Sequence, residues 1–242
     1  MTGMTISNAI REGNPSQRAL GSCGLTCLLA CLLYGPLILT LRTASYPKKP
    51  MPTLFLYGIL FLYQLLLVLV LYGGLYLVRG VGQNFIVANW TKSRNWLEDF
   101  FTGLLVGIFS IGLTVAIHFL FGSFSRSGTN PSNLQPRNPL EIVLFLPLMI
   151  VVAATEELIF RGYFFQQFYA WSGNIGRAMI LQAAAFSTAH GLHQTAAGVT
   201  DKIAFGLLLG WLANREKSLI PGIIAHSFGN IIFALLGIVL VN

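Results

Sequence analysis

The chain has 242 residues, of which 55% are hydrophobic and only 10% are charged, and its mean hydropathy is +0.69. Soluble domains contain about 25% charged residues, so this composition excludes an ordinary soluble protein and indicates an integral membrane protein. The hydrophobic residues come in helix-length runs rather than in short alternating segments, which predicts an all-α, polytopic membrane protein. The net charge is +7, and the basic residues are scattered over short loops. We therefore expect the basic residues to contact membrane lipids rather than nucleic acid.

The N-terminal half contains long uncharged runs that follow a polar tail at residues 1–18. The runs are Ala19–Leu41, Thr53–Val78 and Phe100–Ser125. Each can cross a hydrocarbon core about 30 Å thick, so residues 19–125 are predicted to form three transmembrane helices, the first kinked near Pro36. Basic residues are divided almost evenly between alternate loops, so they do not predict the orientation.

Three cysteines recur every four residues in the first run, at Cys23, Cys27 and Cys31. This spacing places them on one face of a helix, where we interpret them as small packing residues. Three thiols without nearby histidines make a poor zinc site, and residues on one helix cannot form the usual disulfides.

A linker rich in Pro, Asn, Ser and Gly occupies residues 126–138 and separates two regions of different texture. Beyond it the apolar runs shorten to between 12 and 14 residues, at Ile142–Thr155, Ala178–Ala189 and Ile203–Asn214. Such runs span a membrane only if their polar extensions face a protein-lined interior. We therefore expect about seven membrane helices in one membrane domain, with a polar cleft among the C-terminal helices.

The first polar set of this region is Glu156, Glu157 and Arg161, which directly follow an apolar run. Each charge at the bilayer centre costs roughly 2.5–3.5 kcal/mol, so function is the default explanation. On a helix Glu157 and Arg161 are neighbours, whereas Glu156 lies about 100° around the axis and can face a cavity. A purely structural Glu157–Arg161 ion pair is the alternative.

Two further sets have helical spacing: Phe186 with His190, and His226 with Asn230. Each histidine is a weak signal by itself. Polar groups on apolar helices need hydrogen-bond partners, and these groups can supply partners to one another if they face a common interior. We therefore predict that the three sets converge.

Together and in this order, the three sets resemble the motifs of the CAAX protease and bacteriocin-processing family, the Abi or type II CAAX prenyl endopeptidases. The resemblance covers about residues 139–240 and has no departure at the motif positions. It implies a CAAX-protease-like core over residues 139–242 and an intramembrane, glutamate-dependent peptidase without a cofactor. Its substrate would be a membrane-tethered or leader peptide, either lipidated with a prenyl group or without one.

The roles expected for these residues follow from their chemistry. Glu156 and His190 would bind and deprotonate a water molecule, and His226 with Asn230 would form the oxyanion hole. Arg161 would hold Glu157 as a support for Glu156, although the roles of two adjacent glutamates are exchangeable.

Other functions remain open at this point. A zinc hydrolase can use Glu156, His190 and His226 as ligands with Glu157 as the base, but the local H-E-x-x-H signature is absent. A non-enzymatic peptide-binding or immunity protein and a transporter with a proton relay are further alternatives. In every case we expect a multi-pass protein, of the plasma (inner) membrane.

Overall fold

The structure is a computed structural model that describes residues 23–36, 52–77, 95–122, 136–191 and 195–241. Within these ranges the chain forms helices and no strand, which confirms the all-α prediction. Four helices are long and apolar enough to cross a membrane, and two shorter apolar helices accompany them. The polar tail and most of the predicted linker lie outside the described residues.

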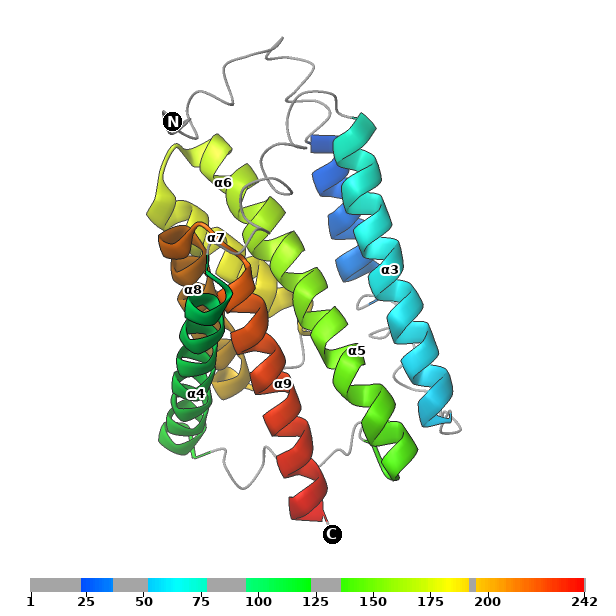
Figure 1. Cartoon of the computed structure of the whole chain (residues 1–242). Helices are drawn as coiled ribbons and strands as arrows, with labels where there is room; N and C mark the ends of the chain where they lie inside the picture. Colours follow the sequence, from blue (N-terminus) through cyan, green and yellow to red (C-terminus); the bar gives the residue numbers. More distant parts are fainter. Residues whose placement is uncertain (1–22, 37–51, 78–94, 123–135, 192–194, 242) are drawn as a thin grey trace.

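The elements are arranged side by side in a helical bundle (Figure 1). In chain order they are the helix Cys23–Pro36, α3 (Thr53–Leu77), α4 (Trp96–Leu120), α5 (Pro139–Glu157), the π-helix η2 (Leu158–Phe164), α6 (Phe165–Ser172), α7 (Ile175–Ala189), α8 (Ala196–Glu216) and α9 (Ile220–Val241). The elements α5, η2 and α6 form one continuous helix of 34 residues, from Pro139 to Ser172. This helix crosses the centre of the bundle and carries the first polar set.

Asparagine side chains begin three of the helices. The side-chain oxygens of Asn95, Asn138 and Asn174 each accept a hydrogen bond from a backbone N–H in the first turn of α4, α5 and α7. These caps satisfy donors that a helix terminus leaves without partners. Because Asn95 caps α4, this helix begins at Trp96, four residues before the predicted start of the third apolar run, and its first turn is acidic.

The short apolar runs of the C-terminal half lie inside longer helices, because their polar extensions are buried against protein. Gln182 of α7 is fully buried, and its Nε2 donates to the carbonyl of Gly206 in α8 at 2.7 Å. Asp201 of α8 is also buried and accepts a hydrogen bond from Thr114 Oγ1 of α4 at 2.6 Å. The α8 helix therefore reaches 21 residues, enough to be a candidate span, although its apolar run is much shorter.

The N-terminal helices share a hydrophobic core with the central helix. Leu29 of the first helix, Leu71 of α3 and Phe160 of η2 are buried in one cluster. The hydroxyl of Tyr34 donates to the carbonyl of Ala185 in α7 at 2.8 Å, which ties the first helix to the C-terminal half. The α3 and Cys23–Pro36 helices therefore form one wall of the bundle beside α5 (Figure 1).

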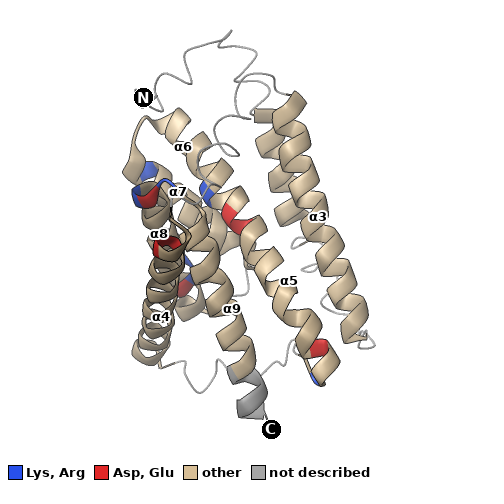
Figure 2. Ribbon diagram, viewed as in Figure 1, with Lys and Arg blue, Asp and Glu red and all other residues tan. Residues whose placement is uncertain are grey.

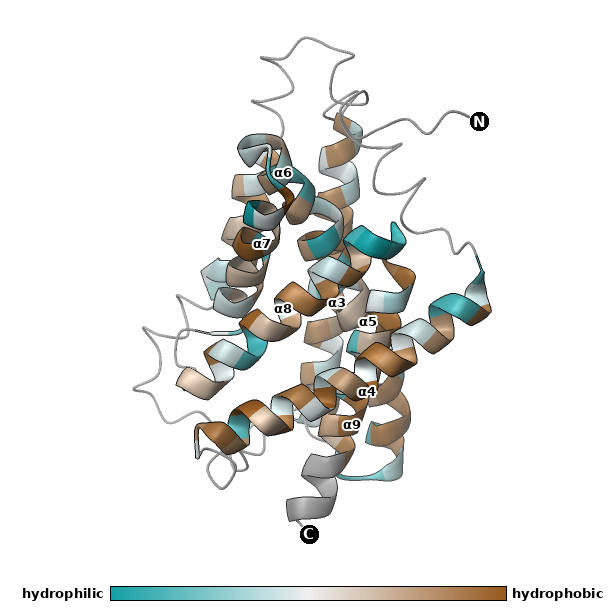
Figure 3. Cartoon of the chain, turned by 90° about the vertical axis from the view of Figure 1, so that its left-hand side faces the viewer, coloured by the Kyte–Doolittle hydropathy of each residue, from teal (hydrophilic) through white to brown (hydrophobic). Residues whose placement is uncertain are grey.

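Two glycines allow α4 to pack closely against α9. A Cβ atom at Gly103 would lie 2.7 Å from Ile224 Cβ and from the carbonyl oxygen of Pro221. One turn later, a Cβ at Gly107 would lie 3.0 Å from a ring carbon of Phe228. The residues in contact at these two glycines are apolar or backbone groups, so this close approach depends on packing rather than on hydrogen bonds between side chains. Brown, hydrophobic residues predominate on the middle of α4 and on the coloured part of α9 (Figure 3).

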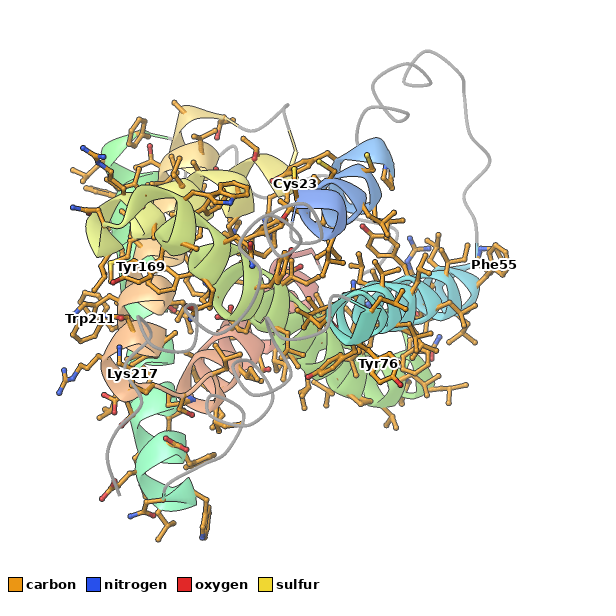
Figure 4. All side chains as sticks on the ribbon, turned by 90° about the horizontal axis from the view of Figure 1, so that it is seen from above. Cys23, Phe55, Tyr76, Tyr169, Trp211 and Lys217 are labelled. Carbon is orange, nitrogen blue, oxygen red and sulfur yellow. The ribbon has the colours of Figure 1, made fainter. Side chains whose placement is uncertain are left out.

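The outer surface of the bundle is apolar. Phe55 and Tyr76 of α3 and Trp211 of α8 are exposed and lie at the periphery when the bundle is seen from above (Figure 4). Charged residues are sparse over the described helices (Figure 2). A surface of this kind is stable against lipid tails and unfavourable against water.

The three cysteines lie on one face of the first helix, but this face is exposed. The buried face of the same helix carries Leu25 and Leu29. The interpretation of Cys23, Cys27 and Cys31 as packing residues is therefore wrong. Leucines fill the core at this point because a larger side chain is needed to reach α3, where Leu25 contacts Gly74.

Candidate active site

Glu157 is the buried centre of the polar cluster. Its side chain is inaccessible to solvent, and its Oε1 atom accepts two hydrogen bonds. Arg161 Nη1 donates one of them from η2 at 2.9 Å, and His226 Nδ1 lies at the same distance on α9. The i,i+4 ion pair expected from the sequence is thus present, with a histidine from a distant helix as a third member.

Glu156 lies beside this buried group and has different surroundings. Its Oε2 atom is 3.6 Å from His226 Nε2 and 3.8 Å from His190 Nε2, and it makes no hydrogen bond. The Oε2 atom is buried between the imidazoles, yet the whole side chain is 21% exposed and that of His190 is 28% exposed. The accessible side of the cluster is therefore formed by Glu156 and His190.

The hydrogen bonds of the histidines orient both rings toward Glu156. His190 Nδ1 lies 2.8 Å from the carbonyl oxygen of Phe186, which can only accept, so Nδ1 carries the proton. The carboxylate of Glu157, paired with Arg161, likewise accepts from His226 Nδ1. In each ring the hydrogen bond at Nδ1 therefore turns the Nε2 atom toward the space next to Glu156.

The aromatic ring of Phe186 packs against the polar cluster. Its ring is fully buried, lies 4.3 Å from the ring of His190 between centroids, and carries the guanidinium of Arg161 over its face at 4.4 Å. A cation over an aromatic face is stabilised by the ring quadrupole, most strongly away from water. Phe186 therefore positions His190 and compensates part of the buried charge of Arg161.

The π-helix η2 follows the two glutamates directly. Its wider turn is evident at its end, where the backbone N–H of Phe165 bonds to the carbonyl of Phe160, five residues earlier. Short π-helical segments occur frequently at functional sites because they rotate the side chains that follow them. Here η2 contributes Arg161, and its residues Ile159 to Phe164 are all buried.

Glu156, Glu157 and Arg161 lie near the middle of the central helix, whereas its other charged residue, Glu141, lies in the first turn (Figure 2). The structure brings together five of the residues predicted for the site: Glu156, Glu157, Arg161, His190 and His226. Asn230 lies one turn after His226 on α9 and is half-buried, and no hydrogen bond connects its amide to the other five. Its part in the site stays a prediction.

Sequence reasoning missed Phe205 and Gly222. The ring of Phe205 packs edge-on against His226 with centroids 5.1 Å apart and also contacts Phe186 at 6.0 Å. Nothing distinguishes this phenylalanine from the lipid-facing residues of α8 in the sequence. Gly222 lies against the carboxylate of Glu157, and its Pro-Gly context predicts a turn rather than a position in a helix.

Across the described ranges, no group of three or more His, Cys, Asp or Glu side chains is arranged to hold a metal ion. The alternative zinc ligands Glu156, His190 and His226 are therefore not supported by the geometry. Two imidazoles and a carboxylate around a partly accessible space can instead bind a water molecule and take up its proton.

The comparison with protein families gave one match in the C-terminal part of the chain. Residues 138–232 match the family described as type II CAAX prenyl endopeptidase Rce1-like. This range includes all the motif residues from Glu156 to Asn230, so the predicted resemblance to this family is confirmed for this part of the chain. The comparisons with curated proteins and with solved structures gave no match.

The family is one of proteases of the glutamate type, which need no cofactor. Together with the four long apolar helices, the match indicates a membrane protein and supports a protease, and a protease family implies a peptide or protein as substrate.

Proposed function

We propose that this protein is an intramembrane endopeptidase of the CAAX prenyl protease type, which cleaves a peptide bond with a water molecule activated by Glu156. One observation carries the proposal. His190 Nε2 and His226 Nε2 both face Glu156 Oε2, at the accessible side of a cluster whose other carboxylate is buried and accepts from Arg161 and His226 at Oε1. The activity rests on the residues of α5, α7 and α9, which come from separate parts of the chain.

Glu156 is the better candidate for the general base. The Oε1 atom of Glu157 already accepts from Arg161 and His226, and its side chain has no contact with solvent. Glu156 has no such donors and is partly accessible, so a proton from a bound water can reach it. Glu157 then has a supporting role, since it fixes the ring of His226 as well as Arg161.

The proposed reaction balances its protons within the site. Glu156 takes a proton from the water, and the hydroxide forms a bond with the carbonyl carbon of the substrate. The protonated Glu156 then gives this proton to the leaving nitrogen as the C–N bond breaks. A product carboxylic acid and a product amine remain, and the carboxylate of Glu156 is restored. The acid then gives its proton to the amine, so the released products are a carboxylate and an ammonium group.

The remaining residues would stabilise the tetrahedral intermediate. His226 can donate from Nε2 to the oxyanion only as an imidazolium, because its Nδ1 proton is already given to Glu157. Asn230 is proposed as a second donor, which requires its half-buried amide to turn toward the substrate.

The substrate is proposed to be a peptide at the membrane, either tethered near its C-terminus, with or without a prenyl group, or carrying a leader. The apolar outer surface and the four candidate spans support a multi-pass protein that meets such peptides within the bilayer. Residence in the plasma membrane and contact with its lipids belong to the same proposal.

Comparison of membrane peptidomes tests this function. Cells would contain either the wild-type protein, Glu156→Gln, or the matched control Glu216→Gln, whose carboxylate lies at the end of α8 and pairs with Arg215. We expect new peptide termini with the wild-type protein and with the control, and none with Glu156→Gln. A peptidome that is identical in all three would refute the protease and favour a peptide-binding or immunity protein.

A further inference from the structure

The two oxygens of the Glu157 carboxylate have unequal surroundings. Oε1 accepts from Arg161 and His226, whereas Oε2 is buried and has no hydrogen-bond partner. Oε2 lies against Gly222 of α9, where an added Cβ atom would be 3.2 Å away. Ordinary contacts of a Cβ atom fall between 3.4 and 4 Å, so the carboxylate occupies space that a side chain at position 222 would take.

The same carboxylate contacts two successive turns of α9. Gly222 lies in the first turn of this helix, and His226 follows it by four residues on the same face. The first backbone N–H groups of a helix have no partners within the helix, and this end carries a partial positive charge. A buried carboxylate is therefore favoured beside Gly222, with one oxygen against the first turn and the other on His226.

We propose that Gly222 is a positioning residue, which sets the distance between α9 and Glu157 and thereby fixes the His226 ring toward Glu156. A side chain at this position must displace either the carboxylate or the helix. The carboxylate is held at Oε1 by Arg161 and His226, so its displacement would stretch at least one of these bonds. Displacement of α9 would move His226 itself.

Gly229 provides a matched control on the same helix. A Cβ atom at Gly229 would meet nothing within 4 Å. Helix propensity favours alanine over glycine at both positions. A defect of Gly222→Ala that Gly229→Ala does not share can therefore be assigned to the contact with Glu157.

The first measurement needs no substrate. The chain has four histidines, and ¹⁵N spectra of the histidine-labelled protein in detergent would report the hydrogen bond of His226 Nδ1, assigned with His226→Gln. We expect Gly222→Ala to shift the Nδ1 resonance of His226, and Gly229→Ala to leave it in place. An unchanged resonance in Gly222→Ala would overturn the inference.

The second measurement rests on the proposed function and separates rate from binding. Because a displacement of about 1 Å can cost 100-fold in rate, a displacement of a few tenths should lower kcat of Gly222→Ala roughly tenfold, with KM nearly unchanged. Glu157→Asp shortens the side chain by one methylene and makes room for a Cβ atom. The double variant Glu157→Asp/Gly222→Ala should therefore lose less activity than the product of the two single losses.

The two proposals fail in different ways. If Gly222→Ala shifts the His226 resonance but the wild-type protein cleaves no peptide, the positioning role of Gly222 is supported and the proposed peptidase function is refuted. If the wild-type protein cleaves peptides and Gly222→Ala changes neither the His226 resonance nor kcat, only the positioning role of Gly222 is refuted. If Gly222→Ala does not fold, folding of the double variant with Glu157→Asp would support the inference, and its failure to fold would contradict it.

Discussion

Glu156 and Glu157 are adjacent in the chain, but they belong to different regions of the site. On the buried side, Glu157 is inaccessible and holds Arg161 and His226 with one oxygen. On the open side, Glu156 faces two imidazole nitrogens and has no hydrogen bond at Oε2. Under the proposed function, the environment rather than the residue type assigns a different role to each carboxylate, as it does in enzymes that use paired acids.

Glu156→Gln should have the largest effect on turnover. Glutamine is nearly isosteric but cannot take up a proton, so we expect cleavage to fall roughly 100- to 10,000-fold, the usual contribution of a general base. The melting temperature in detergent should stay close to that of the wild-type protein, because Glu156 Oε2 makes no hydrogen bond. If this variant cleaves at nearly the wild-type rate, Glu156 is not the general base, and Glu157 becomes the candidate for that role.

Arg161→Ala should have the largest effect on stability. It leaves a buried carboxylate without its ion-pair partner, a change that costs about 3–5 kcal/mol of unfolding free energy. Both the melting temperature and the rate of cleavage should fall. Glu156→Gln should lower only the rate, so the two variants distinguish the buried side of the site from the open side. Arg215→Ala is the control, because its pair with Glu216 is largely exposed and should contribute little. Equal stability of the two variants would contradict the structural role of Arg161.

Asn230→Ala should have a smaller effect than Glu156→Gln and should leave the fold intact. Removal of one oxyanion donor costs about 100- to 1,000-fold in rate, while the base remains. The rate should be measured at saturating peptide, together with the rate of Asn214→Ala, whose amide accepts from Lys217 outside the site. A wild-type rate in Asn230→Ala would remove this residue from the oxyanion hole.

Metal removal should have the smallest effect. Under the proposed mechanism Glu156 activates the water without a metal ion, so prolonged dialysis against a strong chelator should leave the rate of cleavage unchanged. The metal content of the protein should be measured before and after dialysis. If activity is lost on dialysis and restored by Zn²⁺, the two histidines and Glu156 would instead be interpreted as zinc ligands.

The sequence predicts much of the site because ionisable residues in apolar helices have few explanations. The i,i+4 spacing predicts the contact between Glu157 and Arg161, and the requirement to satisfy buried polar groups predicts the approach of His190 and His226. The α3 helix agrees with its apolar run within one residue, since helix ends in such runs are set by the first polar or helix-breaking residues.

Other features depend on tertiary contacts that no local pattern reports. The π-helical turn after Glu157 has no sequence signal that differs from α-helix, and Phe205 belongs to an apolar helix in which many residues are equivalent. The exposed cysteines show the same limit. Their periodicity predicts a shared face, but leucine and cysteine are both apolar, so periodicity does not predict which face is buried.

The length of the central helix links the site to the thickness of the bilayer. Its 34 residues extend about 50 Å, whereas a hydrocarbon core is about 30 Å thick. This helix must therefore tilt or project beyond the lipid tails, and its tilt changes when the bilayer becomes thinner or thicker. Glu156 and Glu157 end α5 within this helix, so a change of tilt moves the two carboxylates relative to the headgroups. Under the proposed function, lipid chain length would then influence which bond of an anchored peptide is cleaved.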